Sequence, residues 1–188
     1  MSERRTAPHG VMYWITGLAG VGKTTIGTAL HERIKTFNQA VVMLDGDALR
    51  EVFGNDLGYT AEDRYKCAMR YARLSKYLCD QGITVICCTI SMFEKVRQWS
   101  RNNVSKYIEV YVKASDKTLE ERDKKNLYSG GYSNVAGINQ PVEVPVSPHI
   151  TLNNDGDAEV ASFVESILLL EPETGDDFCL ENSSRIRK

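Results

Sequence analysis

Short apolar runs alternate with amphipathic segments along the first 170 residues of the chain. Apolar runs of strand length, bounded by turn residues, predict buried β-strands at 11–16, 41–44, 83–89 and 107–112. Apolar residues at helical spacing predict helices at 24–37, 61–80, 93–102 and 116–122. An edge strand is expected at 149–152 and a closing helix at 158–170. This alternation predicts an α/β fold with a mostly parallel sheet of about five strands, covered by helices on both faces.

The remaining segments divide the chain into one domain with two tails. Residues 1–10 are polar and are predicted to be disordered, and 171–188 are predicted to form a mobile tail. The domain itself is expected to span 11–170. Inside it, 123–148 is rich in Gly and Pro and has no periodic pattern. An irregular stretch of that length within a compact domain is usually functional, which predicts a lid.

A glycine-rich turn lies between the first predicted strand and the first predicted helix. Gly17-Leu18-Ala19-Gly20-Val21-Gly22-Lys23-Thr24 fits the pattern G-x-x-x-x-G-K-[ST] at every defined position. Glycines let backbone N–H groups close around a phosphate, and the positive end of the helix points at the same anion. A chance glycine-rich turn is the alternative, but the strand before it and the helix after it favour a nucleotide site. We therefore expect ATP and Mg²⁺ as cofactors in a P-loop NTPase three-layer sandwich, with Lys23 on the β and γ oxygens and Thr24 as the metal ligand.

Two aspartates follow the second predicted strand, in the sequence Asp45-Gly46-Asp47. One interpretation is a turn followed by a helix cap, a role suited to Asp47. The other is that one carboxylate orients or deprotonates an attacking hydroxyl, with Arg50 one helical turn later holding a substrate phosphate. Gly17, Asp45 and Thr89 all follow predicted parallel strands, so they are expected to meet at one edge of the sheet.

Charge and cysteine content exclude several other classes of protein. The net charge is −2 and no long basic run occurs, which argues against a nucleic-acid surface. The five cysteines form no Cys-x-x-Cys pair and include two neighbours in an apolar run, so buried thiols are expected in place of disulfides or zinc ligands. The apolar runs are too short to span a membrane and no apolar signal core begins the chain, so a cytoplasmic protein is predicted.

Several motifs together resemble the adenylylsulfate (APS) kinase family, from about Val11 to Leu152. Beyond the glycine-rich loop they are Leu44-Asp45-Gly46-Asp47 with Arg50, Asp56-Leu57-Gly58-Tyr59, Asp63-Arg64, Ile90-Ser91-Met92, Arg122-Asp123-Lys124-Lys125-Asn126-Leu127-Tyr128 and Gly137-Ile138-Asn139-Gln140-Pro141. The resemblance implies a phosphotransferase that acts on an alcohol group, the ribose 3′-hydroxyl of a nucleotide. It also implies a homodimer.

The same resemblance implies roles for individual residues. Lys23, Asp45 and Asp47 are the catalytic candidates, and the sequence leaves open which aspartate is the base. The ATP site is expected to comprise Gly17, Ala19, Gly20, Val21, Gly22, Lys23, Thr24, Thr25, Arg122 and Lys125. The acceptor site is expected to comprise Asp45, Asp47, Arg50, Tyr59, Arg64, Cys67, Ile90, Ser91, Lys125 and Val135.

Three departures from the family pattern fall on residues of the expected acceptor site. Cys67 stands where the family usually has Asn, Val135 where a lid Phe stacks on adenine, and Tyr59 where the Asp-Leu-Gly motif ends in Phe. One lost stacking aromatic costs about 1–3 kcal/mol. The lid between 128 and 137 is also shorter, which suits a smaller base.

The chain accordingly looks closer to a variant branch of the family that includes cytidine diphosphoramidate kinase, an enzyme of capsule synthesis. Cytidine diphosphoramidate is the favoured acceptor and adenylylsulfate the alternative. A regulatory ATP-binding module is the alternative of another class, although such a module needs neither Arg50 nor Arg64. A GTPase switch would need Asp-x-x-Gly and Asn-Lys-x-Asp motifs, which the sequence lacks.

Overall fold

The computed structural model describes residues 9–122, 136–137, 140–170 and 173–174. Its strands are β1 (Met12–Thr16), β2 (Val41–Asp45), β3 (Thr84–Thr89), β4 (Lys106–Lys113), β5 (Ile150–Asn153) and β6 (Glu173–Thr174). Its helices are α1 (Lys23–Lys35), α2 (Gly46–Val52), α3 (Ala61–Cys79), α4 (Glu94–Asn103), α5 (Asp116–Glu121) and α6 (Val160–Leu168).

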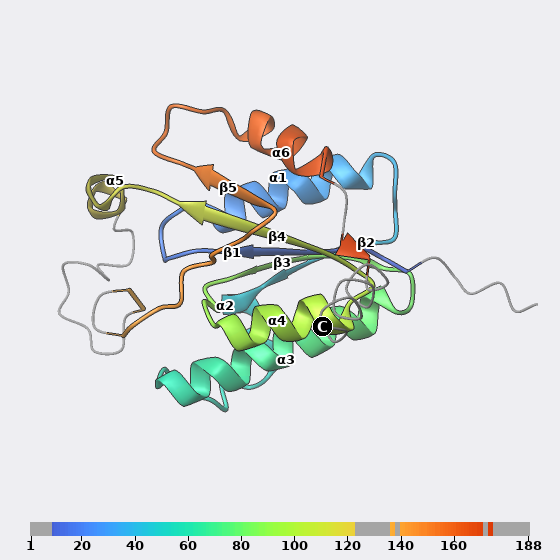
Figure 1. Ribbon diagram of the computed structural model, residues 1–188, viewed down its shortest axis with the longest axis horizontal. Coiled ribbons are helices and arrows are strands. Elements are labelled where there is room, and N and C mark those ends of the chain that lie inside the picture. Colours follow the sequence, from blue (N-terminus) through green and yellow to red (C-terminus); the bar gives the residue numbers. More distant parts are fainter. Residues whose placement is uncertain (1–8, 123–135, 138–139, 171–172, 175–188) are drawn as a thin grey trace, which may run out of the picture.

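The sheet has the strand order β2-β3-β1-β4-β5, and all four of these pairings are parallel. The short β6 adds an antiparallel pairing to the start of β4. Helices α1 and α6 cover one face of the sheet and α3 and α4 cover the other (Figure 1). The predicted three-layer α/β sandwich with a mostly parallel sheet is therefore confirmed.

The core lies on both faces of the sheet because the central strands are buried on both sides. In β1, Tyr13 and Ile15 belong to the cluster under α1 and α6. Their neighbours Met12 and Trp14 belong to the cluster under α3 and α4. Side chains alternate between faces along a strand, so one apolar run supplies both cores. This explains why the run shows no polar alternation in the sequence.

Two elements were not predicted as such. Helix α2 follows β2 directly, and β6 pairs with β4 through residues of the predicted tail. The rest of that tail, 171–172 and 175–188, lies outside the described residues. Of the predicted disordered N-terminus only 9–10 are described, and the Gly10 N–H donates to the Cys79 carbonyl oxygen over 2.9 Å. Most of the predicted lid, 123–135 and 138–139, also lies outside the described residues.

Two composition-based expectations concern the described part of the chain. Cys67, Cys79, Cys87 and Cys88 are all buried free thiols, as expected, and Cys179 lies outside the described residues. Burial raises the pKa of the Cys79 and Cys88 thiols to about 12. None of the described helices combines the length and the apolar character that crossing a membrane requires.

Candidate active site

The glycine-rich loop connects β1 to α1 at the carboxyl edge of the sheet (Figure 1, left). Gly22 adopts φ 94°, which strains any other residue, and a Cβ there would lie 2.4 Å from Nδ2 of Asn154 and would displace that amide. Lys23 begins α1 and donates from Nζ to the Leu18 carbonyl oxygen over 2.6 Å, across the loop. The first turn of α1 contains no acidic residue. The helix therefore directs its positive end, with the loop N–H groups, at any anion bound there.

The predicted residues of this loop differ in exposure. Val21 is 1% exposed and anchors the loop in the core, while Gly20, Thr24 and Thr25 are exposed. Gly17 is buried and Ala19 is half-buried. The loop thus presents its backbone and two hydroxyl side chains to the outside and fixes itself through Val21.

Asn154, just beyond β5, holds the loop from the other side. Its Nδ2 donates to the Val21 carbonyl oxygen over 2.8 Å, and its backbone N–H donates to the Lys113 carbonyl oxygen. Arg122 in turn donates from Nη1 to the Asn154 carbonyl oxygen over 2.9 Å. Asn154 was not predicted as a site residue. The available signal was its place after a predicted strand, at the same edge as Gly17.

Asp45 connects the loop to the start of α2. Its Oδ1 accepts hydrogen bonds from the backbone N–H groups of Asp47 (2.9 Å) and Ala48 (3.4 Å). Its Oδ2 accepts from the Thr24 hydroxyl over 2.9 Å. The helix cap is therefore Asp45, and the suggestion that Asp47 serves as the cap is wrong. Asp45 leaves the strand in an extended conformation, which an N-cap requires, whereas Asp47 is already helical and exposed.

The contact between Asp45 and Thr24 has a chemical consequence. A hydroxyl and a carboxylate oxygen meet beside the loop that is shaped for phosphates. Mg²⁺ in kinases is held by one or two such hard oxygens together with substrate phosphates. The Thr24 hydroxyl is such an oxygen and fits that ion, with the Asp45 carboxylate beside it.

A second cluster lies beyond α2, around the exposed ring of Tyr59. The Arg50 guanidinium lies 4.4 Å and the Arg64 guanidinium 5.2 Å from the ring centroid. Arg50 also donates to the carbonyl oxygens of Leu57 and Gly58 over 2.9 and 3.1 Å. Burial, and then the positive charge of Arg50, lower the pKa of the Arg64 guanidinium. Two cations held close together around an aromatic ring are a suitable receptor for an anionic, ring-containing ligand.

The end of β3 brings further predicted residues to the same edge. The Thr16 hydroxyl donates to the Ile90 carbonyl oxygen over 2.7 Å, and the Ser91 and Thr89 hydroxyls lie 2.6 Å apart. Cys67 is only 6% exposed and packs in the core under α3. Lys125 and Val135 lie outside the described residues.

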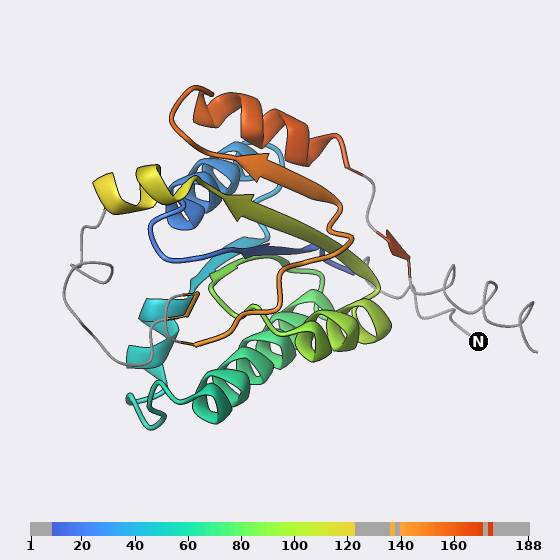
Figure 2. The same cartoon turned by 60° about the vertical axis from the view of Figure 1, so that its left-hand side comes forward.

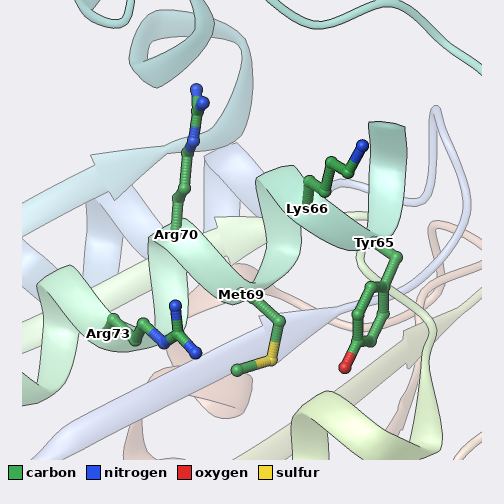
Figure 3. Close-up of a pocket in the computed structure, with 5 residues that line it drawn as sticks. All are labelled: Tyr65, Lys66, Met69, Arg70 and Arg73. Carbon is green, nitrogen blue, oxygen red and sulfur yellow. The ribbon is translucent and has the colours of Figure 1, made fainter. Parts of the chain in front are cut away.

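A surface groove of about 300 Å³ lies on α3, lined by Tyr65, Lys66, Met69, Arg70 and Arg73. Figure 3 shows Arg70 pointing to the opposite side of the helix from Tyr65 and Met69. Lys66 is paired with Glu62 over 2.7 Å and Arg70 with Asp56 over 2.7 Å. Because Lys66 and Arg70 are already paired with carboxylates, and Arg70 points away from Tyr65 and Met69, we place the site at the sheet edge and not in this groove.

The Asp45 carboxylate accepts a hydrogen bond from the threonine of a loop that is shaped for phosphates, and a separate cationic cluster lies at the same sheet edge. This combination defines a P-loop kinase. The adenylylsulphate kinase family model matches residues 9–153. The chain belongs to that family, and it is an ATP-dependent nucleotide kinase that phosphorylates a hydroxyl group.

Two relatives show equal identity to this chain. An adenylyl-sulfate kinase of Halothermothrix orenii is 37% identical over 166 residues, which cover 86% of this chain and 90% of that protein. A cytidine diphosphoramidate kinase of Campylobacter jejuni is 37% identical over 159 residues, which cover 82% and 92%. The solved APS kinase CysC of Mycobacterium tuberculosis, in complex with AMPPNP and APS, has a TM-score of 0.77 at 27% identity, over 86% of this chain and 96% of that one.

Asn154→Ala is expected to raise the KM for ATP by about 2- to 12-fold, the range of one lost hydrogen bond. The reason is that Val21 loses the amide that holds its carbonyl group. Steady-state kinetics with ATP and then the acceptor varied would measure this. Asn103→Ala is the matched control, because Asn103 makes a similar bond to the Trp99 carbonyl group at the end of α4. Equal rises in both KM values would contradict a role specific to the ATP loop.

Proposed function

We propose that the enzyme transfers the γ-phosphoryl group of ATP to the ribose 3′-hydroxyl of a nucleotide 5′-phosphoanhydride, and that cytidine diphosphoramidate is its acceptor. The observation that carries the transfer step is the 2.9 Å contact between Asp45 and the hydroxyl of Thr24. It places the Asp45 carboxylate beside Thr24, which follows Lys23 in the phosphate loop. An attacking hydroxyl bound there would face both a base and the phosphoryl group.

On the donor side, the loop from Gly17 to Thr25 would hold the phosphates of ATP. Lys23 would neutralise the β and γ oxygens, which requires its Nζ to exchange the Leu18 carbonyl group for phosphate. Thr24 would ligate Mg²⁺, which supplies charge neutralisation when it is bound. Arg122, fixed to Asn154, and Lys125 would complete the ATP site.

On the acceptor side, Asp45 would accept the proton of the 3′-hydroxyl while the new O–P bond forms and the bond to the β-phosphate oxygen breaks, releasing ADP. Asp47, exposed in the first turn of α2, is the second carboxylate at this edge. Arg50 and Arg64 would hold the 5′-phosphate groups beside Tyr59. Ile90, Ser91, Cys67 and Val135 would complete the site toward the base.

The choice of cytidine as the acceptor base rests on the residues of the acceptor site that would lie nearest to that base. Cys67 is buried and offers no amide where the family usually has Asn, so a hydrogen-bonding group for the base or the phosphate is missing there. Val135 replaces the stacking Phe. A relative at 37% identity carries the name cytidine diphosphoramidate kinase. A smaller base that needs less stacking area fits these substitutions.

Adenylylsulfate is the second candidate acceptor, because a relative of the same identity is named adenylyl-sulfate kinase. A coupled assay of ATP consumption with each acceptor would separate the two. We expect kcat/KM to be at least about tenfold higher with cytidine diphosphoramidate, a difference of about 1.4 kcal/mol. Lys23→Ala should abolish transfer to either acceptor and serves as the negative control. A preference for adenylylsulfate would overturn the cytidine assignment and leave the 3′-kinase proposal in place.

A further inference from the structure

The turn around Gly137 touches both the phosphate loop and the acceptor cluster. The Gly137 N–H donates to the Gln140 carbonyl oxygen over 2.9 Å, and Ala136 forms an isolated parallel β-bridge with Gln140. Gly137 has φ 85°, and a Cβ there would lie 2.6 Å from Cδ2 of Leu18. The phosphate loop therefore lies directly against this turn.

On its other side the same turn reaches Tyr59. The Gln140 Nε2 donates to the Tyr59 carbonyl oxygen over 2.9 Å. That carbonyl oxygen also accepts from Nε of Arg64 over 3.1 Å. One backbone oxygen thus joins Gln140 to an arginine that also lies by the Tyr59 ring.

The chain beyond Gln140 is fastened as well, which keeps the amide in place. The Glu143 N–H donates to the Met92 carbonyl oxygen over 3.0 Å, and the Glu143 carboxylate accepts from the backbone N–H of Glu94. From there the segment runs back toward β5 (Figure 2). Gln140 is therefore held between the loop that follows β3 and the loop that precedes α3.

We propose that Gln140 is a positioning residue of the acceptor site, which acts through the Tyr59 carbonyl group to hold Arg64 and the Tyr59 ring in their binding arrangement. Guanidinium groups lose less entropy on binding an anion when they are already oriented. Without the amide of Gln140, Tyr59 and Arg64 would have to be ordered by the acceptor itself. The loss would appear in acceptor affinity and not in ATP affinity. This inference rests on the proposed assignment of the cluster to the acceptor.

Gln140→Met tests this role because methionine has a similar length and no N–H donor. A side chain needed only for packing would be replaced without effect. Gln81→Met is the matched control, because Gln81 donates from Nε2 to the Tyr77 carbonyl oxygen over 3.1 Å at the end of α3. Calorimetric titrations with CDP and with AMP as acceptor-side probes, and with ATPγS as donor probe, need no turnover.

We expect Gln140→Met to weaken the binding of whichever acceptor probe the wild type binds by about 2- to 12-fold, the range of one hydrogen bond. ATPγS binding should stay within about twofold, and Gln81→Met should match the wild type throughout. Unchanged CDP and AMP affinities, an equal loss for ATPγS, or a wild type that binds neither probe would overturn the proposal. Absence of phosphoryl transfer by a wild type that binds the probes would instead count against the proposed function.

Discussion

Asp45→Asn is expected to lower kcat by about 10²- to 10⁴-fold, the usual contribution of a positioned general base. The amide oxygen of Asn can still accept from the N–H groups of Asp47 and Ala48, so the cap of α2 is retained. What the variant lacks is a group that can take the proton of the attacking hydroxyl. The KM for ATP should change by no more than about threefold, because the loop backbone keeps its contacts and the Thr24 hydroxyl, now beside an amide, can accept where it donated before.

Asp47→Asn is the matched control for this prediction and also decides which aspartate is the base. Asp47 follows two residues later, in the first turn of α2, and is exposed, whereas the N-cap of this helix is Asp45. The kcat of Asp47→Asn is expected to fall far less, relative to the wild type, than the kcat of Asp45→Asn. A selective loss of ATP binding in Asp45→Asn, with kcat retained, would mean that Asp45 serves the metal or the loop and not the acceptor hydroxyl.

Glu109→Leu is expected to lower the free energy of unfolding by about 3 kcal/mol, because it removes one partner of a buried ion pair. Glu109 and Arg97 are each 1% exposed, and Nε of Arg97 lies 3.6 Å from Oε1 of Glu109. Arg101 reaches the other carboxylate oxygen at 2.9 Å, and the Tyr107 hydroxyl donates to it as well. Arg97 keeps Glu94 as a partner, which sets the estimate at the lower end of the range for buried pairs. Denaturant unfolding of both proteins would measure the difference.

The double variant Arg97→Met with Glu109→Leu is the control for that measurement. Replacing both members of a buried pair by apolar residues of similar size is often neutral. The double variant should therefore be more stable than Glu109→Leu alone. Surface substitutions usually change the free energy of unfolding by no more than about 0.5 kcal/mol. If the value for Glu109→Leu lies that close to the value for the wild type, the pair does not behave as a buried ion pair.

The fold was predictable because its signals are local. Each apolar run that was predicted to be a strand is one, although only Val41 is fully buried in β2, which lies at the edge of the sheet. Helix α3 begins at Ala61 as predicted, and the Thr60 hydroxyl caps it by accepting from the N–H of Asp63. Helix α2 was raised only as one interpretation of the Asp47 position and was not predicted as an element, because it follows β2 with no intervening loop and is only 7 residues long. β6 was missed because 2 residues carry no periodic pattern, and only pairing with β4 defines them.

The candidate site was predictable wherever a motif prescribes the residue. The phosphate loop has a fixed spacing, and the aspartates stand at the end of an apolar run. The contacts of Asn154 with Val21 and of Gln140 with Tyr59 join residues 133 and 81 positions apart. No spacing rule links such pairs, since the fold alone brings them together. The shared carbonyl group of Tyr59 likewise becomes visible only once Arg64 and Gln140 are placed.

We propose that the γ-phosphoryl group goes to a ribose 3′-hydroxyl at the sheet edge where Thr24 meets Asp45. ³¹P NMR of the product formed from ATP, Mg²⁺ and cytidine diphosphoramidate tests this most directly. We expect a new phosphomonoester resonance coupled to the ribose H3′, formed at a rate that Asp45→Asn lowers sharply. Release of inorganic phosphate without a phosphorylated nucleotide, from both this acceptor and adenylylsulfate, would contradict it.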